Sequence, residues 1–382
     1  MKENYRIAIL GAGPSGLFIF KRLVESGRQD LLIDIYEKGT KLGAGMPYSK
    51  YGANDEHITN VSGNEIPEIV TPLAEWLEKV PTATLKRFNI NLEKFNDYKV
   101  LPRLLFGEYL TAQFQLLIQK AKNKGLKVNI YLNSPITDIT DVPDEKLVRV
   151  HVLDGDTYEY ERVVISTGHQ WPKKHENKVP GYFDSPYPPQ KLVSRLNHAI
   201  AIKGSSLTAI DAIRTLARNN GHFNKDENGK VSFIPSEGSA KFQLVMHSRN
   251  GLLPAVRFHL EDSHLAKDAI LSVAEINANR EINEGFLSLD YVFDRNFKTL
   301  FKELDPEFYR EIAEMDMETF VCSMMELRER VDAFQLFKAE YTEAEKSIRR
   351  RESVIWKEML AVLSFAMNYP AKYLSAEDTL RL

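Results

Sequence analysis

Cysteine is almost absent from this sequence, since Cys322 is the only one in 382 residues. A disulfide within the chain is therefore excluded, and so is a redox-active Cys-x-x-Cys pair supplied by the chain itself. Cys322 lies in an amphipathic, methionine-rich segment, VCSMM. This setting favours a packed thiol over a nucleophile.

An excess of charge of one sign is also missing, because 50 Lys and Arg face 53 Asp and Glu, for a net charge of −3. A nucleic-acid interface needs clustered surplus cations, so none is expected. No apolar run approaches the roughly 20 residues of a membrane-spanning helix. The first apolar run breaks at Gly11, too early for the core of a signal peptide. We therefore expect a cytoplasmic protein with no membrane or nucleic-acid partner, and we predict no metal site.

The first 40 residues instead have the pattern of a βαβ unit. Arg6 to Leu10 is a short β-type run, and Pro14 to Glu25 has apolar residues at helical spacing. Leu31 to Tyr36 is rich in branched and aromatic residues, as buried parallel strands are. Strand, glycine turn, helix and strand follow one another in the order of a dinucleotide-binding unit.

The turn of this unit reads GAGPSG, which places Gly11, Gly13 and Gly16 in G-x-G-x-x-G register. In such a motif the first glycine allows the tight turn, the second lets the backbone approach a pyrophosphate, and the third lets helix and strand pack. The helix that follows offers its N-terminal amide groups to the phosphates. Glu37 ends the second strand, where an acid accepts hydrogen bonds from a ribose. The motif in this context predicts bound FAD.

Two further segments belong to the same prediction. A glycine-dense run, GAGMPY, from Gly43 to Tyr48 lies in a stretch, residues 39–72, that we expect to be long and irregular. It is either a second approach to the cofactor, with Asn60 near the flavin, or an ordinary surface loop. The strand RVVI ends in Ser-Thr-Gly-His, and its tip would pass the nucleotide. His169 then flanks the turn, because nothing in the sequence pairs it with a catalytic base.

A second strand–turn–helix is predicted over residues 198–219, followed by an exposed polar insertion at 222–240 and a strand at 241–247. Its turn is a degenerate motif in which Gly204, Ser206 and Ala209 occupy the three glycine positions. The following strand runs into Arg249, a cation that suits the 2′-phosphate of NADPH. The alternative is a Rossmann-like unit that has lost its ligand.

The expected architecture is α/β, with two Rossmann-like dinucleotide-binding units and a mainly helical C-terminal region. The boundaries predicted from composition are 1–190 for the FAD domain, 191–261 for the NAD(P)-binding-like unit and 262–382 for the helical region. A helix is also expected over Leu104 to Lys124, and strands over Val128 to Tyr131, Leu147 to Val152 and Tyr158 to Ile165.

In this order the motifs GAGPSGL, GAGMPYS, HITNV, LPRLLFGEYL, VVISTGH and GSSLTAIDA resemble bacterial FAD/NAD(P)-binding oxidoreductases. That family is similar to the N-hydroxylating and Baeyer–Villiger flavin monooxygenases. The resemblance covers residues 5–260. It implies FAD contacts at Gly11, Gly13, Pro14, Ser15, Gly16, Glu37, Lys38, Tyr48, Asn60, Arg103, Thr167 and Gly168. For Arg103, which precedes a helix, direct binding of a diphosphate and a solvated surface position both remain open.

For the second unit we expect NADPH at Gly204, Ser205, Ser206 and Arg249. The predicted function is an FAD-dependent oxidoreductase in which NADPH reduces the flavin and oxygen passes to a small substrate. No catalytic side chain is assigned, because the flavin carries the chemistry. The alternatives are a reductase that passes electrons to a partner, and an FAD-binding sensor or scaffold without turnover. The chain departs from the family after residue 262, where no glycine-rich segment returns to cover the flavin.

Overall fold

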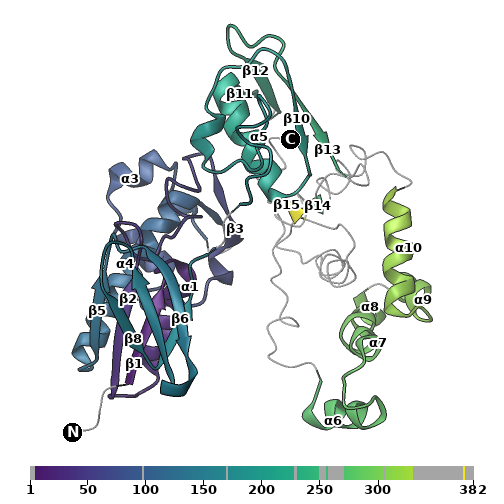
Figure 1. The fold of residues 1–382 in the computed structure, drawn as a ribbon. Helices are drawn as coiled ribbons and strands as arrows, with labels where there is room; N and C mark the ends of the chain where they lie inside the picture. Colours follow the sequence, from purple (N-terminus) through teal and green to yellow (C-terminus); the bar gives the residue numbers. More distant parts are fainter. Residues whose placement is uncertain are drawn as a thin grey trace. The chain divides into compact units, whose positions relative to one another are not determined.

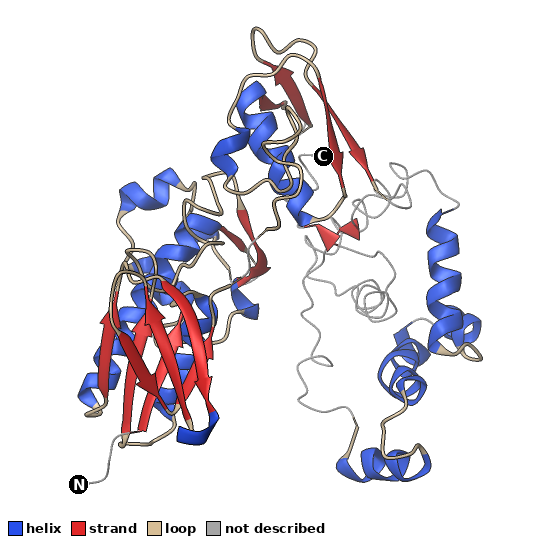
Figure 2. Ribbon diagram, in the orientation of Figure 1, coloured by secondary structure: helices blue, strands red, loops and turns tan. Residues whose placement is uncertain are grey.

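The computed structural model describes residues 5–96, 99–168, 171–227, 230–248, 255–256, 271–304, 306–329 and 373–374. The chain divides into two units, which are coloured along the sequence in Figure 1. The first unit is Met1–Arg195 together with Asp211–Asn219, and the second is Leu196–Ile210 together with Asn220–Leu382. Helices and strands are mixed, as Figure 2 shows, so the predicted α/β class is confirmed at this level.

A four-stranded parallel sheet is the centre of the first unit. Its strands lie in the order β5-β2-β1-β9 and are β1 (Tyr5–Leu10), β2 (Leu31–Tyr36), β5 (Lys127–Tyr131) and β9 (Arg162–Ile165). In β1 and β2 nearly every residue is buried, because both faces of a parallel sheet are covered. The strands predicted from these apolar runs are therefore confirmed.

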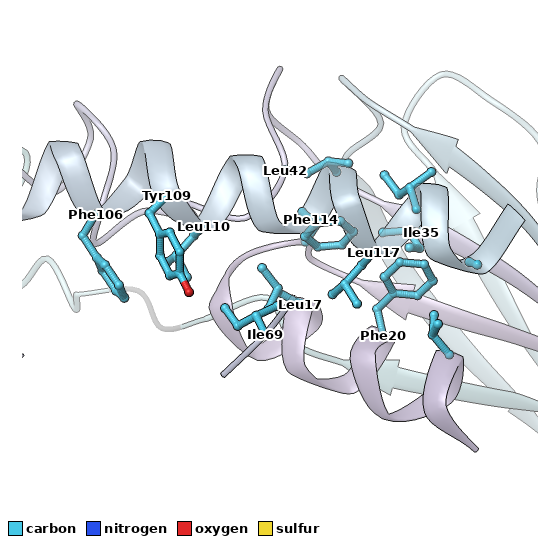
Figure 3. Close-up of a cluster of buried hydrophobic side chains, with 14 of the residues drawn as sticks. Leu17, Phe20, Ile35, Leu42, Ile69, Phe106, Tyr109, Leu110, Phe114 and Leu117 are labelled. Carbon is cyan, nitrogen blue, oxygen red and sulfur yellow. The ribbon is translucent and has the colours of Figure 1, made fainter. Parts of the chain in front are cut away.

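Two helices cover the same core. They are α1 (Pro14–Glu25) and α4 (Arg103–Asn123), and Figure 3 shows their buried side chains facing one another. Leu17 and Phe20 of α1 are fully buried, and the Phe20 ring stacks on Phe114 with 5.5 Å between centroids. Each such side chain contributes about 1.5–3 kcal/mol on burial. Both helices lie where the sequence predicted them.

A three-stranded antiparallel sheet packs next to the parallel one and consists of β6 (Ile136–Val142), β7 (Leu147–Val152) and β8 (Thr157–Tyr160). The Tyr160 hydroxyl donates to Asp34 at 2.7 Å and lies 2.7 Å from the Tyr36 hydroxyl, so a buried polar network joins the two sheets. The single strand predicted over residues 158–165 was wrong in one respect. The segment forms two strands that are separated at Glu161. The first, β8, pairs antiparallel with β7, whereas the second, β9, pairs parallel with β1.

The segment between β2 and α4 has more structure than predicted. It contains β3 (Ile58–Ser62), α2 (Leu73–Glu78), α3 (Thr82–Arg87) and β4 (Val100–Pro102), with short 3-10 turns at Gly63–Glu65 and Leu92–Lys94. The prediction of a long irregular segment over residues 39–72 was wrong in part, because β3 pairs antiparallel with β4 about 40 residues later in the chain. Further 3-10 turns lie at Pro143–Glu145 and Pro189–Leu192.

The second unit begins with the predicted strand–turn–helix: β10 (Ala199–Lys203), then α5 (Leu207–Asn220), whose residues 211–219 belong to the first unit. β13 (Gln243–His247) pairs parallel with β10. The polar segment 222–240 is mostly exposed, as predicted, and in addition it contains a hairpin of β11 (Gly221–Lys225) and β12 (Val231–Pro235). The rings of Phe223 and Phe233, 5.3 Å apart, pack across it.

The remainder of the described second unit is mostly helical. It comprises α6 (Val273–Ile282), α7 (Leu289–Val292), a π-helical turn (Phe293–Lys298), α8 (Thr299–Leu304), α9 (Pro306–Ile312), α10 (Met317–Glu329) and the two-residue pair β14 (Ala255–Val256) and β15 (Tyr373–Leu374). Phe293, Phe297 and Phe320 pack against one another within the buried cluster of these helices. Cys322, on α10, is half-buried. The predicted boundary at 261–262 lies outside the described residues, and the three-domain division stays a prediction.

Candidate nucleotide-binding site

The first glycine turn is compressed between β1, β9 and α1. Gly11 has φ of +98°, and its amide donates to the Tyr36 carbonyl at 2.8 Å. A Cβ at Gly11 would lie 2.4 Å from the Ser166 carbonyl oxygen, and one at Gly16 would lie 2.2 Å from the Gly11 oxygen. Both positions therefore exclude any side chain, in agreement with the turn and packing roles predicted for them.

Gly13 occupies a less crowded position at the start of α1. A Cβ there would meet only the Gly45 backbone, with its Cα at 3.3 Å. Pro14 takes the first helical position, Ser15 is exposed, and no side chain caps the helix at Gly13. An uncapped helix N-terminus presents amide groups and a positive dipole end that suit an anion.

The Glu37 carboxylate is held in place next to this turn. It accepts the amide of Ala12 at 3.0 Å and the amide of Gly39 at 2.8 Å, one on each oxygen. A carboxylate has about four acceptor sites, so both oxygens can still accept hydroxyl groups. Lys38, the next residue, is exposed. Glu37 therefore has the position and the spare acceptor capacity that a ribose diol requires.

The segment from Gly43 to Tyr48 is packed against the chain itself. Gly43 has no room for a Cβ, which would lie 2.5 Å from the Leu110 carbonyl oxygen, and a Cβ at Gly45 would lie 3.0 Å from Pro14 Cδ. The Tyr48 ring packs edge-on against Phe106, and burial raises the pKa of its hydroxyl. The glycines of this segment are buried or half-buried, so the segment is packed at Gly43 and Gly45, while Pro47 is exposed. Its approach to the cofactor stays a prediction.

The strand ends bring several predicted residues to one edge of the sheet. Gly11, Glu37 and Thr167 follow the carboxyl ends of β1, β2 and β9, which are adjacent and parallel. This is the edge at which ligands bind in open α/β sheets. Thr167 and Gly168 are exposed, and Asn60 is exposed on β3. His169 lies outside the described residues.

Arg103 is not the solvated surface arginine that one interpretation proposed. Only 14% of its side chain is exposed, and its Nη1 donates to Asp211 at 2.6 Å. Tyr187 donates its hydroxyl to the same Asp211 oxygen, and burial raises the pKa of Tyr187 to about 12. Sequence reasoning missed Asp211 and Tyr187. The one available signal was an acid between Ile210 and Ala212, on an otherwise apolar stretch of helix.

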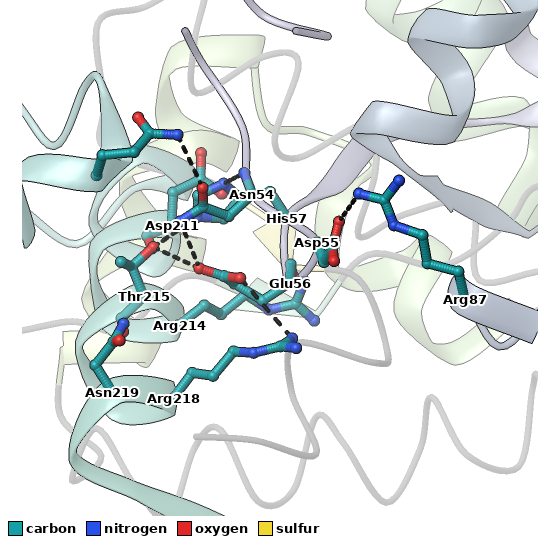
Figure 4. A network of polar contacts seen from close by, with 11 residues as sticks. Asn54, Asp55, Glu56, His57, Arg87, Asp211, Arg214, Thr215, Arg218 and Asn219 are labelled. Atoms are coloured by element: carbon teal, nitrogen blue, oxygen red, sulfur yellow. Dashed lines mark hydrogen bonds and ion pairs between the residues drawn. The ribbon is translucent and has the colours of Figure 1, made fainter. Parts of the chain in front are cut away.

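His57 belongs to the adjoining buried network, shown in Figure 4 with Asp211 and Thr215. Its Nδ1 accepts the Asn54 amide at 3.0 Å, so that nitrogen carries no proton. Its Nε2 lies 3.2 Å from the Asp211 carbonyl and 3.0 Å from the Thr215 hydroxyl. Burial lowers the pKa of His57. The contacts thus select the neutral ring with its proton on Nε2.

The second glycine turn repeats the backbone geometry of the first. Gly204 has φ of +112°, and its amide donates to the His247 carbonyl at 2.7 Å. Ser205 and Ser206 are half-buried, and Ser206 precedes α5 without capping it through its side chain. Arg249, predicted to bind the 2′-phosphate, lies outside the described residues.

In the described ranges, no helix is long and apolar enough to span a membrane, and no cluster of acidic, histidine or cysteine side chains is arranged to hold a metal.

Residues 8–170 match the model of the FAD-NAD(P)-binding family, and residues 272–382 match that of the YdhS-like middle domain. The first match confirms the family resemblance and the predicted cofactor class, FAD with NAD(P). The chain is 29% identical to the uncharacterized protein YdhS of Escherichia coli strain K12, over 98% of this chain and 69% of that protein.

Among solved structures, the chain resembles flavin monooxygenases at low identity. Cyclohexanone monooxygenase from Rhodococcus sp. Phi1 bound to NADP+ matches at 11% identity and a TM-score of 0.35, over 74% of this chain and 44% of that one. Ornithine N-hydroxylase from Kutzneria sp. 744 matches at 12% identity and a TM-score of 0.40, over 98% and 72%. The chain spans less than half the length of the cyclohexanone monooxygenases.

Proposed function

We propose that this chain is an FAD-dependent oxidoreductase of the monooxygenase type, in which NADPH reduces the flavin and oxygen passes to a small substrate. The observation that carries the proposal is the pairing of an uncapped glycine turn with a carboxylate, Glu37, at the end of the adjacent strand. A diphosphate and a ribose are the two groups that this pairing suits. The family match over residues 8–170 supports it.

The residues of the first unit fit FAD. Gly13 leaves space for the diphosphate, and Glu37 would receive the ribose hydroxyls. Pro14 takes the first helical position without an N–H of its own, so the first amide that α1 offers to the charge is that of Ser15. Lys38, Tyr48, Asn60, Thr167 and Gly168 are the other residues that we assign to the FAD side. When bound, FAD supplies the redox chemistry, and the protein supplies binding, orientation and exclusion of water.

NADPH is assigned to the second turn, at Gly204, Ser205, Ser206 and Arg249. Ser206 takes the place that faces the pyrophosphate, and its hydroxyl can donate a hydrogen bond there. Ser248 and then Arg249 follow β13, where the first unit has Glu37 after β2. A cation in place of an acid favours the 2′-phosphate of NADPH over the free hydroxyl of NADH.

The experiment that tests this function is an absorbance spectrum of the purified protein before and after anaerobic NADPH. We expect a yellow protein whose heat-released flavin is FAD, and loss of the flavin absorbance when NADPH is added. FMN, or no flavin after reconstitution with FAD, would refute the proposal. Bound FAD that neither NADPH nor NADH reduces would favour the sensor. Reduction without an oxygenated flavin on admission of air would favour the electron-passing reductase.

A further inference from the structure

Arg103 joins three separate segments of the first unit through its backbone and side chain. Its amide donates to the His57 carbonyl at 2.9 Å, and its Nε donates to the Ile58 carbonyl at 2.7 Å. Its Nη1 donates to Asp211 at 2.6 Å. His57 closes a ring of contacts, because its Nε2 lies 3.2 Å from the Asp211 carbonyl.

Both charged partners are deeply buried, with 14% of the Arg103 side chain and 7% of the Asp211 side chain exposed. An isolated charge at such a position is strongly unfavourable, so each residue needs the other. The Tyr187 hydroxyl also donates to the carboxylate and lies 3.4 Å from Nη1 of Arg103. The guanidinium is thus held by protein groups on both its Nε and its Nη1.

The two carbonyls that Arg103 holds are at the beginning of β3. Ile58 is the first residue of this strand, and Asn60 follows two residues later. The register of β3 against β4 shifts between Ile58 and Ser62, so the bonds to the His57 and Ile58 carbonyls fix the path of the chain where it enters this irregular stretch, two residues before Asn60. Asp211 in turn fixes the direction of the guanidinium through a charge-assisted hydrogen bond.

We propose that Arg103 and Asp211 are a pair of positioning residues that fix β3, and with it Asn60, against the flavin. Arg103 then acts through β3 and not as a direct ligand of the FAD diphosphate. This inference rests on the proposed function, because it requires FAD in the first unit. It changes the role that the family resemblance implies for Arg103.

The test compares Arg103→Ala, Asp211→Ala and the double variant with the unmutated protein, in FAD affinity and in the visible spectrum of the bound flavin. A positioning pair predicts that both single variants lower FAD affinity equally, by up to about tenfold, because either change frees β3 and so costs the one hydrogen bond that Asn60 would make with the flavin. The double variant should be no weaker than either single variant, since contacting residues are not additive. The flavin spectrum should shift in the same way in all three.

A direct diphosphate ligand gives a different result. Arg103→Ala would then weaken FAD much more than Asp211→Ala, and the double variant would resemble Arg103→Ala; this outcome would overturn the proposal. The matched control is Arg87→Ala, which removes an exposed ion pair with Asp55 and should leave FAD affinity unchanged. If the alanine variants do not fold, Arg103→Gln, which keeps a polar but uncharged side chain, and the isosteric Asp211→Asn are compared by the same criterion. Unmutated protein that binds no FAD refutes the proposed function itself, whereas FAD binding with unequal variants refutes only this inference.

Discussion

The two strand–turn–helix units of this chain have the same backbone geometry. In each, a glycine with positive φ follows the strand, and its amide donates to the last carbonyl of the neighbouring parallel strand, Gly11 to Tyr36 and Gly204 to His247. In each, the helix begins without a side-chain cap. The chain therefore forms the same type of turn twice from different residues.

The side-chain packing of the two turns differs. Gly11 and Gly16 have no room for a Cβ, whereas a Cβ at Gly204 would meet nothing within 4 Å and Ala209 already carries one. β1 has β9 on its other side, while β10 pairs only with β13 in the described part of the second unit. Two of the three glycines in the first motif are thus required by the fold itself. The information about a ligand lies in Gly13 and Glu37.

The largest effect is expected from exchanging the third residue of each motif. Gly16→Ala places a Cβ against the Gly11 carbonyl, and we expect a loss of about 3 kcal/mol in unfolding free energy, at the upper end for overpacking. Ala209→Gly removes a methyl group from a helix and should cost about 1 kcal/mol. Urea denaturation of both variants measures the difference. Equal losses would show that the two turns are packed alike.

The parts of the fold predictable from sequence are those set by local pattern. Pro14–Glu25 and Leu31–Tyr36 were predicted because buried parallel strands and amphipathic helices have short-range apolar signatures. The pairing of β3 with β4 was missed, because its partner lies about 40 residues away and neither strand has a marked apolar alternation.

In the candidate site, too, the residues of local motifs are predictable from sequence, and the residues joined by long-range contacts are not. The glycine turn and Glu37 can be predicted from sequence, because the motif is contiguous and lies at a fixed spacing from the end of the second strand. The burial of Arg103 cannot be predicted from sequence, because its partner Asp211 is 108 residues away and only the tertiary fold brings the two together. The exposure of residues 222–240 was predictable from their polarity, but the hairpin that they form was not, because its pairing and the contact of Phe223 with Phe233 join residues about ten positions apart.

A second pair of variants tests the ligand position of each motif. Gly13→Val should abolish FAD binding, because a branched side chain would occupy the space of the diphosphate. Ser206→Val should leave FAD content unchanged and weaken NADPH at least about tenfold, through loss of one hydrogen bond to a charged group. FAD content and anaerobic stopped-flow reduction across NADPH concentrations measure the two effects. A reduction curve for Ser206→Val that matches the unmutated protein would place the nicotinamide elsewhere.

The control for this pair is the folded state of each variant. A Cβ at Gly13 comes within 3.3 Å of the Gly45 Cα, so Gly13→Ala is included as the smaller change. Its circular dichroism and urea midpoint should remain close to those of the unmutated protein while FAD affinity falls. If Gly13→Ala binds FAD normally, the space at Gly13 is not used by the diphosphate.

The smallest and most specific effects are expected at the ends of two strands. Glu37 directly follows β2, and Arg249 comes two residues after β13 in the sequence. Glu37→Gln keeps the shape of the side chain, but its amide group turns a donor toward either the Ala12 or the Gly39 amide. We expect FAD affinity to fall about tenfold, the cost of one charged hydrogen bond.

Arg249→Ala should leave FAD affinity unchanged and lower the preference for NADPH over NADH by a similar factor. Arg249→Lys should restore the preference only in part, because lysine lacks the planar fork that binds a phosphate. Flavin reduction rates with both nicotinamides, measured on all three variants, give the preference directly. The two effects must be independent, because an acid that contacts FAD has no part in choosing between the nicotinamides. If Glu37→Gln changes the preference, or if Arg249→Ala changes FAD affinity, the assignment of one dinucleotide to each unit is wrong.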